Sequence, residues 1–214
     1  YDDWCISIFA EAMSDFETKA KYERFAKAYE FYFDKSTRFM RGLDSKGEWR
    51  TPFNPRASTH RSDDYCEGTA WQWTWFVPHD VDGLVNLMGG EDAFVQKLDS
   101  LFTVDSSLEG EMISSDISGL IGQYAHGNEP SHHVIHLYNY VNRPWRTQEL
   151  VDSVYQSQYA NSTDGLSGNE DCGQMSAWYI LNSMGFYQVC PGKPIYSIGR
   201  PALDRKSTRL NSSH

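Results

Sequence analysis

Residues 80–102 read Asp80-Val-Asp-Gly-Leu-Val-Asn-Leu-Met-Gly-Gly-Glu-Asp-Ala-Phe-Val-Gln-Lys-Leu-Asp-Ser-Leu-Phe102 and predict two consecutive helices. The apolar side chains expected to face a core are Val81, Leu84, Val85 and Met88 in the first half and Phe94, Val95, Leu98, Leu101 and Phe102 in the second. Their spacing of three and four residues is that of an amphipathic helix. Gly89 and Gly90 end the first helix, and acidic residues suit the first turn of the second. The segment therefore predicts a helical hairpin.

The same spacing predicts helices elsewhere in the chain, and strands are few. The other predicted helices are residues 4–12, 14–34, 132–140, 144–159 and 174–184. In the helix at 14–34 the predicted core face is Tyr22, Phe25, Ala26, Tyr29 and Phe33. Short strands are predicted within 39–49, around a turn at residues 44–47, and at 186–189 and 195–198. The fold class is therefore mainly α.

Stacked helical hairpins with a few short strands are typical of an (α/α)6 toroid. A closed toroid of six hairpins needs about twelve helices, whereas this chain supplies about seven. We therefore predict a partial toroid, with residues 1–204 forming the C-terminal part of its domain. Residues 205–214 abruptly lose the aromatic character of the preceding chain, and we expect a non-native tail there.

Composition excludes several classes of partner. The 214 residues include 29 acidic and 19 basic side chains, a net charge of −10, which disfavours nucleic acid and anionic membrane surfaces. No apolar run is long enough to span a bilayer. The four widely spaced cysteines (Cys5, Cys66, Cys172 and Cys190) form no CxxC pair and support neither a zinc knuckle nor a dense disulfide framework. Aromatic residues make up 14%, which suits either a sugar-binding cleft or a core rich in tryptophan.

Glu67 is the first candidate for chemistry. It lies in Tyr65-Cys-Glu-Gly-Thr-Ala-Trp-Gln-Trp-Thr-Trp75, after a long polar loop at residues 51–64. A carboxyl group beside three indoles would be partly desolvated, which raises its pKa as a general acid requires. The alternative is a helix-capping or ion-paired glutamate beside core tryptophans.

The second candidate segment is His126-Gly-Asn-Glu-Pro-Ser-His-His133. Asn128 and Glu129 offer hard oxygen ligands on a tight turn, which suits Ca²⁺. Zinc fits less well, because no HExxH spacing occurs and His132 and His133 would point about 100° apart on a helix. Either histidine could instead be a neutral, hydrogen-bonded side chain.

The third segment is Gly168-Asn-Glu-Asp-Cys-Gly-Gln-Met-Ser-Ala-Trp178, a glycine-rich loop that opens a helix. An aspartate at the mouth of a helix is held ionised, as a general base must be, although an acidic helix cap has the same sequence pattern. One carboxyl group in an apolar setting and one in a polar setting are the minimum for glycoside hydrolysis. No GxSxG elbow, Walker loop or dinucleotide fingerprint competes with this interpretation.

Taken together and in this order, the three segments resemble glycoside hydrolase family 92, the calcium-dependent exo-acting α-mannosidases. Met40-Arg-Gly, Trp49-Arg-Thr-Pro-Phe and Tyr196-Ser-Ile-Gly-Arg-Pro201 also fit, so the resemblance spans nearly all of the chain except the tail. It implies an N-terminal β-sandwich, outside this sequence, packed on an (α/α)6 catalytic domain. It also implies inverting hydrolysis of α-linked mannose.

The resemblance assigns roles by position. Glu67 would be the general acid and Asp171 the general base, while Asn128 and Glu129 would help to hold a Ca²⁺ ion that contacts the mannose 2- and 3-hydroxyls. The substrate-binding residues it implies are Trp71, Gln72, His126, His132, His133, Asn169 and Glu170. Some members carry a second aspartate where this chain has Asn169, which cannot act as a base but can orient water.

We therefore expect part of an inverting exo-α-mannosidase that acts on mannose-containing glycans, at α-1,2 or related linkages, with Ca²⁺ as cofactor. The carboxyl groups of Glu67 and Asp171 should lie about 6.5–9.5 Å apart. The intact protein is expected to be secreted or periplasmic, and this fragment alone to be inactive. The alternative is a carbohydrate-binding module that uses the same aromatic cleft without turnover.

Overall fold

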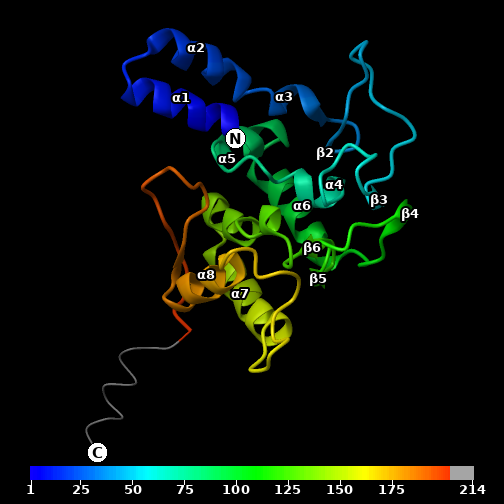
Figure 1. The fold of residues 1–214 in the computed structure, drawn as a ribbon, viewed down its shortest axis with the longest axis vertical. Coiled ribbons are helices and arrows are strands. Elements are labelled where there is room, and N and C mark those ends of the chain that lie inside the picture. Colours follow the sequence, from blue (N-terminus) through cyan, green and yellow to red (C-terminus); the bar gives the residue numbers. More distant parts are fainter. Residues whose placement is uncertain (203–214) are drawn as a thin grey trace, which may run out of the picture.

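The computed structural model describes residues 1–202 and is mainly helical (Figure 1). The helices are α1 (Asp2–Ala12), α2 (Phe16–Phe25), α3 (Tyr29–Tyr32), α4 (Ala70–Trp73), α5 (Val81–Leu87), α6 (Glu91–Thr103), α7 (Pro144–Gln158) and α8 (Gln174–Ser183), with 3₁₀ helices η1 (Glu129–Ser131) and η2 (Val134–Val141). The strands are β1 (Phe33–Asp34), β2 (Phe39–Met40), β3 (Ala57–Thr59), β4 (Glu109–Met112), β5 (Leu120–Ile121), β6 (Tyr124–Ala125), β7 (Phe186–Tyr187) and β8 (Ser197–Ile198).

The strands form only two-stranded sheets within the part of the chain described. The pairs β1–β2, β5–β6 and β7–β8 are antiparallel, and β3–β4 is parallel. The prediction of a mainly α chain with a few short strands is thus confirmed. Residues 205–214, the predicted tail, lie outside the described residues. No helix in residues 1–202 has the length and hydropathy needed to cross a bilayer.

The predicted helical hairpin at residues 80–102 is confirmed as α5 and α6. The Asp80 side chain accepts a hydrogen bond from the Gly83 amide and caps α5. Gly89 and Gly90 both have positive φ, so the chain turns where a side chain would be strained. Leu84, Phe94 and Leu98 are fully buried, which anchors the hairpin to the core.

The predicted long helix at residues 14–34 is wrong. The chain forms α2, which ends at Phe25, then an irregular turn, the short α3, and finally β1, where Phe33 pairs with Met40. None of the residues of α2 is buried, and Phe25 is 47% exposed, so it does not pack as expected. Pairing of β1 with β2 overrides the helical spacing, because it buries Phe33.

A buried ion pair fixes the turn between β1 and β2. Arg41 Nη1 donates to Asp34 Oδ2 at 2.7 Å, and the Ser36 and Thr37 hydroxyls also donate to this carboxylate. Burial alone would raise the pKa of Asp34, but these hydrogen bonds lower it well below its usual range. The turn predicted at residues 44–47 is also present, bounded by the Leu43–Trp49 bridge.

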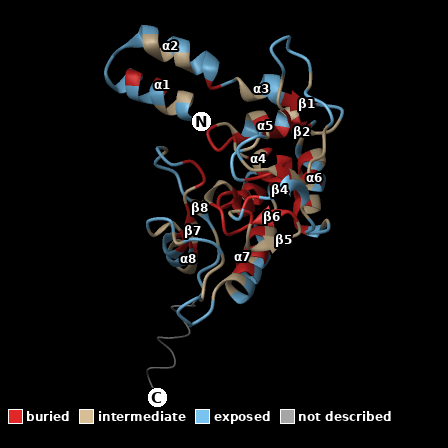
Figure 2. Cartoon of the chain, turned by 45° about the vertical axis from the view of Figure 1, so that its right-hand side comes forward, coloured by how far each residue is buried: buried red, intermediate tan, exposed pale blue. Residues whose placement is uncertain are grey.

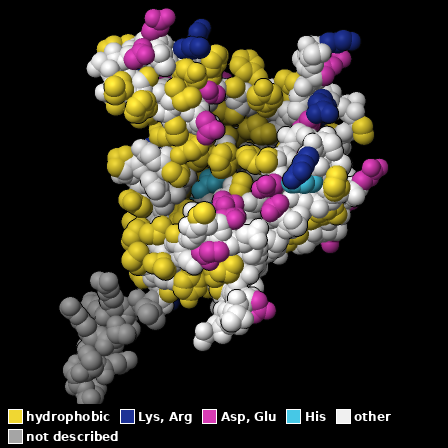
Figure 3. Space-filling view, in the orientation of Figure 1, with side chains coloured by type: hydrophobic (Ala, Val, Ile, Leu, Met, Phe, Trp, Pro, Cys, Tyr) yellow, Lys and Arg dark blue, Asp and Glu magenta, His cyan; other side chains and the backbone are white. Residues whose placement is uncertain are grey.

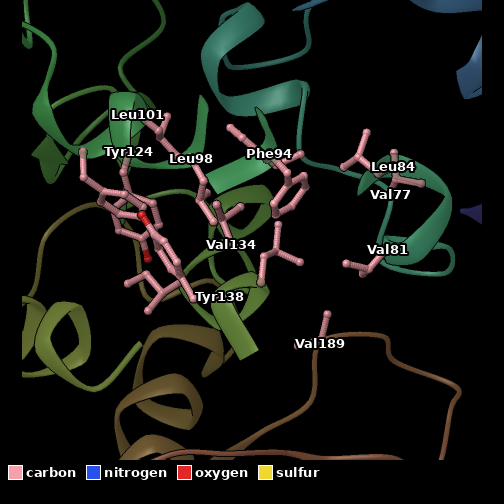
Figure 4. Close-up of a cluster of buried hydrophobic side chains, with 14 of the residues drawn as sticks. Val77, Val81, Leu84, Phe94, Leu98, Leu101, Tyr124, Val134, Tyr138 and Val189 are labelled. Carbon is pink, nitrogen blue, oxygen red and sulfur yellow. The ribbon is translucent and has the colours of Figure 1, made fainter. Parts of the chain in front are cut away.

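The core lies between the α5–α6 hairpin and η2 (Figure 4). Tyr138 of η2 donates its hydroxyl to Asp99 Oδ1 at 2.7 Å and ties η2 to α6. The segment predicted as an α-helix at 132–140 is wound as 3₁₀ helix instead. Six of the eight residues of η2 are buried, so this segment packs against the core on most of its sides.

Exposed apolar residues concentrate outside this core. Figure 2 shows buried residues in the middle of the molecule and mostly exposed or intermediate residues along α1 and α2. These two helices pack on each other, at the end of the molecule opposite α7 and α8 (Figure 1). Phe9, Met13 and Phe16 are each about two-thirds exposed.

Lys97 is an unusual member of the buried face of α6. Its Nζ lies 3.2 Å from the ring centre of Phe39 and 4.3 Å from that of Trp71, and the side chain is 8% exposed. Burial, helped by the charge of Arg38, lowers the pKa of Lys97 to about 7. Cation–π attraction therefore only partly offsets the loss of hydration.

Stability of the protein should consequently depend on Lys97 and on pH. Between about pH 7 and 10 the unfolded chain keeps a proton on Lys97 that the folded chain has lost, so stability rises with pH. Relative to Lys97→Met, the wild type should gain up to about 1.4 kcal/mol per pH unit in this window. The measurement is the unfolding midpoint of both full-length proteins at pH 6, 8 and 9.5. A pH-independent difference between them would contradict the prediction, and exposed Lys46→Met serves as the control.

Candidate active site

A cavity of about 540 Å³ brings together the three sequence segments singled out above. Its lining includes Glu67 from the first segment, Asn128, Glu129, His132 and His133 from the second, and Asp171 from the third. Figure 3 shows acidic side chains and a histidine beside a patch of hydrophobic side chains, in the middle of the face of the molecule that it draws. Segments far apart in the sequence thus contribute their polar side chains to one concave site.

Glu67 lies between the long loop and α4, and its backbone has a φ of 50°. Trp73 Nε1 donates to the carbonyl oxygen of Cys66 at 2.7 Å, and Asn128 Nδ2 donates to that of Glu67 at 2.9 Å. The Glu67 side chain itself is exposed. The predicted desolvation of this carboxyl group by three indoles is therefore wrong.

The tryptophans of this segment point in different directions. Trp71 of α4 and Trp75, two residues after α4 ends, are both buried in the core. Trp73, the last residue of α4, borders the cavity. The two interpretations of the aromatic residues, a core rich in tryptophan and a wall of the cleft, therefore both hold for this segment.

Glu129 stands close to both candidate catalytic carboxylates. The pKa of Glu129 is raised, mainly by burial, and further by a hydrogen bond to Asp171 and by repulsion from Asp171 and Glu67. Among the described residues that line the cavity there is no Lys or Arg. Three carboxyl groups therefore share a site that no Lys or Arg side chain of its lining balances in charge.

Asp171 precedes α8 in a run of left-handed backbone. Asp171, Cys172 and Gly173 have φ values of 46°, 57° and 92°, and Gly173 is the N-cap of α8. The carbonyl oxygen of Asp171 accepts from the Gln174 amide, while Glu170 Oε1 accepts from the Ser176 amide. The carboxylate that caps α8 is therefore that of Glu170, and the Asp171 carboxylate is not used in this way.

The two histidines of the lining are held neutral. Burial lowers the pKa of His132 and of His133 to about 4. His132 Nε2 donates to the His126 carbonyl oxygen, and its Nδ1 faces Gln174 Nε2, so both ring nitrogens are used within the protein. His133 Nε2 donates to the Trp75 carbonyl oxygen at 3.0 Å, which leaves its Nδ1 as an acceptor.

Five of the predicted substrate-binding residues do not line the cavity. Trp71 packs edge-on against Phe39 in the core, and Gln72 completes a capping box with Thr69. The other three are His126, Asn169 and Glu170. His126 is fully buried with its ring nitrogens bonded to Tyr124 and Tyr159, Asn169 is exposed on the loop, and Glu170 caps α8.

Several lining residues were not predicted. They are Tyr1, Trp73, Phe76, Gln174, Tyr187 and Gln188, with small apolar neighbours. Trp73 could have been singled out by helical phase relative to Trp71, because residues two apart in a helix point to different sides. Gln174 follows the predicted general base within the same glycine-rich segment. Nothing in the sequence around Tyr1 or Tyr187 signals a site.

The acidic side chains of the cavity suit a divalent cation, but they supply only part of the ligands that such a cation needs. Within residues 1–202 no group of three His, Cys, Asp or Glu side chains is arranged to hold a metal. Asn128 uses its Nδ2 in the bond to Glu67, and no residue within 1–202 donates a hydrogen bond to its Oδ1, so this oxygen can act as a ligand. Ca²⁺ takes six to eight oxygen ligands, which include amide oxygens, backbone carbonyls and water. Asn128 and Glu129 therefore fit as two of several ligands.

The chain matches the glycosyl hydrolase family 92 catalytic domain over residues 1–214. An uncharacterized secreted glycosidase of Arthroderma benhamiae is 27% identical over an alignment of 228 residues, and this alignment covers 98% of this chain and 27% of that protein.

Two solved structures from Bacteroides thetaiotaomicron are similar as well. The family GH92 α-mannosidase BT3965, in complex with mannoimidazole, is 45% identical with a TM-score of 0.86, and the match covers 94% of this chain and 27% of that one. The family GH92 inverting mannosidase BT2199 is 38% identical with a TM-score of 0.76, over 94% of this chain and 28% of that one. The chain therefore spans about a quarter of the length of these relatives.

Proposed function

Because the chain belongs to glycosyl hydrolase family 92, we propose that it is part of an inverting exo-acting α-mannosidase that removes α-linked mannose from glycans with the help of Ca²⁺. The similarity to two solved mannosidases of this family supports the substrate class. The linkage we propose is α-1,2 or a related one.

One observation carries the proposal. Glu67 and Asp171 belong to segments far apart in the chain, and both line the same cavity. Both also have positive φ, in the left-handed region that residues other than glycine, asparagine and aspartate rarely adopt. Such conformations persist where the surrounding structure imposes them, and they concentrate at functional sites.

In the proposed mechanism the two carboxyl groups act on opposite sides of the glycosidic bond. Glu67 protonates the departing oxygen, and Asp171 accepts a proton from the water that attacks the anomeric carbon. Inversion requires room for that water, so the two carboxyl groups must be about 6.5–9.5 Å apart. His133 Nδ1 accepts a hydrogen bond from a sugar hydroxyl. His132 has a structural role instead, because its hydrogen bonds join Gln174 to the backbone of His126.

Asn128 and Glu129 would hold the Ca²⁺ ion. The bound ion would supply positive charge to orient the sugar hydroxyls, among three carboxylates that otherwise repel one another. Asn128 would serve twice, because its amide nitrogen already fixes the backbone of Glu67.

The remainder of the enzyme is proposed to complete the fold. The exposed apolar residues of α1 and α2 suit packing against further helices of an (α/α)6 toroid, and an N-terminal β-sandwich would pack on that domain. The description of one relative as secreted supports an extracellular or periplasmic location. The fragment alone is then expected to lack activity.

The test is hydrolysis of an aryl α-mannoside by the full-length protein. We expect turnover that EDTA abolishes and Ca²⁺ restores, with β-mannose as the first product in a proton NMR time course. Retention of configuration would contradict the inverting assignment. Binding of mannosides without any turnover would favour a carbohydrate-binding module instead. Full activity in EDTA would contradict the proposed requirement for Ca²⁺.

A further inference from the structure

The backbone of Glu67 needs help to keep its conformation. With a φ of 50° the residue occupies the left-handed region, which is sterically unfavourable for a residue with a Cβ. The side chain is exposed, so its own packing cannot supply the compensation. The contacts that hold this conformation must therefore come from the main chain on either side of it.

Two hydrogen bonds reach two successive carbonyl groups at this point. The indole N–H of Trp73 donates to Cys66, the residue before Glu67, at 2.7 Å, and Asn128 donates to Glu67 itself at 2.9 Å. Each fixes one of the peptide planes that flank the Glu67 α-carbon. Together they determine the direction in which its side chain leaves the backbone.

Gly68 shows how closely the Trp73 indole sits against this turn. A Cβ at position 68 would lie 2.7 Å from Trp73 Nε1 and 2.8 Å from its Cδ1. These distances are too short for a carbon atom, so the ring and the turn fit only because residue 68 is glycine. The indole therefore limits the turn by contact as well as by its hydrogen bond.

The neighbouring tryptophans, Trp71 and Trp75, make no such hydrogen bond with their indole N–H groups. The indole nitrogens of Trp71 and Trp75 are buried, and within the part of the chain described no hydrogen-bond acceptor lies within reach of either. Of the indole N–H groups of Trp71, Trp73 and Trp75, that of Trp73 has an acceptor, and this acceptor adjoins the candidate acid. The side chain also borders the cavity and meets Phe76 edge to face at 5.3 Å.

We propose that Trp73 is a positioning residue for the general acid: its indole N–H holds the carbonyl group before Glu67, and so aims the Glu67 carboxyl group at the departing oxygen of the substrate. This inference rests on the proposed function, in which Glu67 protonates that oxygen. Asn128 makes the equivalent bond on the other side, but its proposed part in cation binding makes it the less informative position to change.

The test is Trp73→Phe in the full-length enzyme, which removes the N–H donor and keeps an aromatic ring. For a glycan with a poor leaving group, kcat should fall about 100-fold, because a misplacement of about 1 Å has an effect of this size, and KM should stay the same. For a dinitrophenyl mannoside, which leaves without protonation, the fall should be much smaller.

Trp75→Phe is the matched control, since it removes an indole N–H that has no acceptor. Loss of core volume should lower its thermal stability, but its ratio of activity on the two substrates should match that of the wild type. An equal loss on both substrates for Trp73→Phe, or none, would overturn the positioning role. If Glu67→Gln itself showed no dependence on the leaving group, the proposed function would fail instead, so the two failures are distinguishable.

Discussion

Glu67→Gln in the full-length protein is expected to lower kcat/KM about 1000-fold for glycans whose leaving group needs protonation. The amide is nearly isosteric with the carboxyl group but has no proton to donate. An activated aryl mannoside should lose little, because its leaving group departs as a stable anion. The measurement compares kcat/KM across a series of aryl mannosides of increasing leaving-group pKa.

Two features make this variant interpretable. Glu67 is exposed, so the change should not unfold the protein, and the peptide bonds that carry its backbone contacts remain. Glu111→Gln, an exposed substitution on β4 away from the cavity, serves as the control and should change nothing. An equal loss of kcat/KM across the whole aryl series would contradict the assignment of Glu67 as the general acid.

The loss of activity in Asp171→Asn, unlike that in Glu67→Gln, should not depend on the leaving group. Loss of the general base slows water attack on every substrate, so kcat should fall about 1000-fold whatever the leaving group. Azide, a nucleophile that needs no deprotonation, should restore part of the rate and yield a β-mannosyl azide. Product analysis by NMR checks both the rate and the configuration.

The backbone at position 171 favours this experiment. Asparagine tolerates a φ of 46° at least as well as aspartate does, so the local turn should survive the substitution. Asp164→Asn, on the exposed part of the same loop, is the matched control. Retained activity in Asp171→Asn, or an α-azide product, would contradict its assignment as the base of an inverting enzyme.

Periodicity predicted the helices whose apolar stripe faces a core. The α5–α6 hairpin, α7 with Pro144 at its first position, and α8 all lie where the spacing placed them. Periodicity failed at residues 14–34 because aromatic residues at helical spacing cannot reveal that Phe33 pairs with Met40. It also failed at η2, which is 3₁₀ helix, because apolar spacing alone does not separate 3₁₀ from α winding in a short buried segment.

The candidate site was predictable as a set of segments but not residue by residue. Carboxyl, amide and histidine side chains ahead of helices marked three segments, and one cavity joins all three. The sequence did not separate Trp73, which borders that cavity, from Trp71, which packs in the core. It also did not distinguish His132, whose nitrogens are both used within the protein, from His133, which keeps an acceptor free.

By itself, the order of residues determined the helical class of the chain and the identity of its acidic, amide and aromatic segments, because both depend on side-chain type and local spacing. Only the tertiary structure decided which of these side chains meet. Contacts between distant segments, such as Asn128 with the backbone of Glu67, arise from packing of the whole core. Local spacing carries no information about such contacts, because the geometry between segments is set by what they bury together.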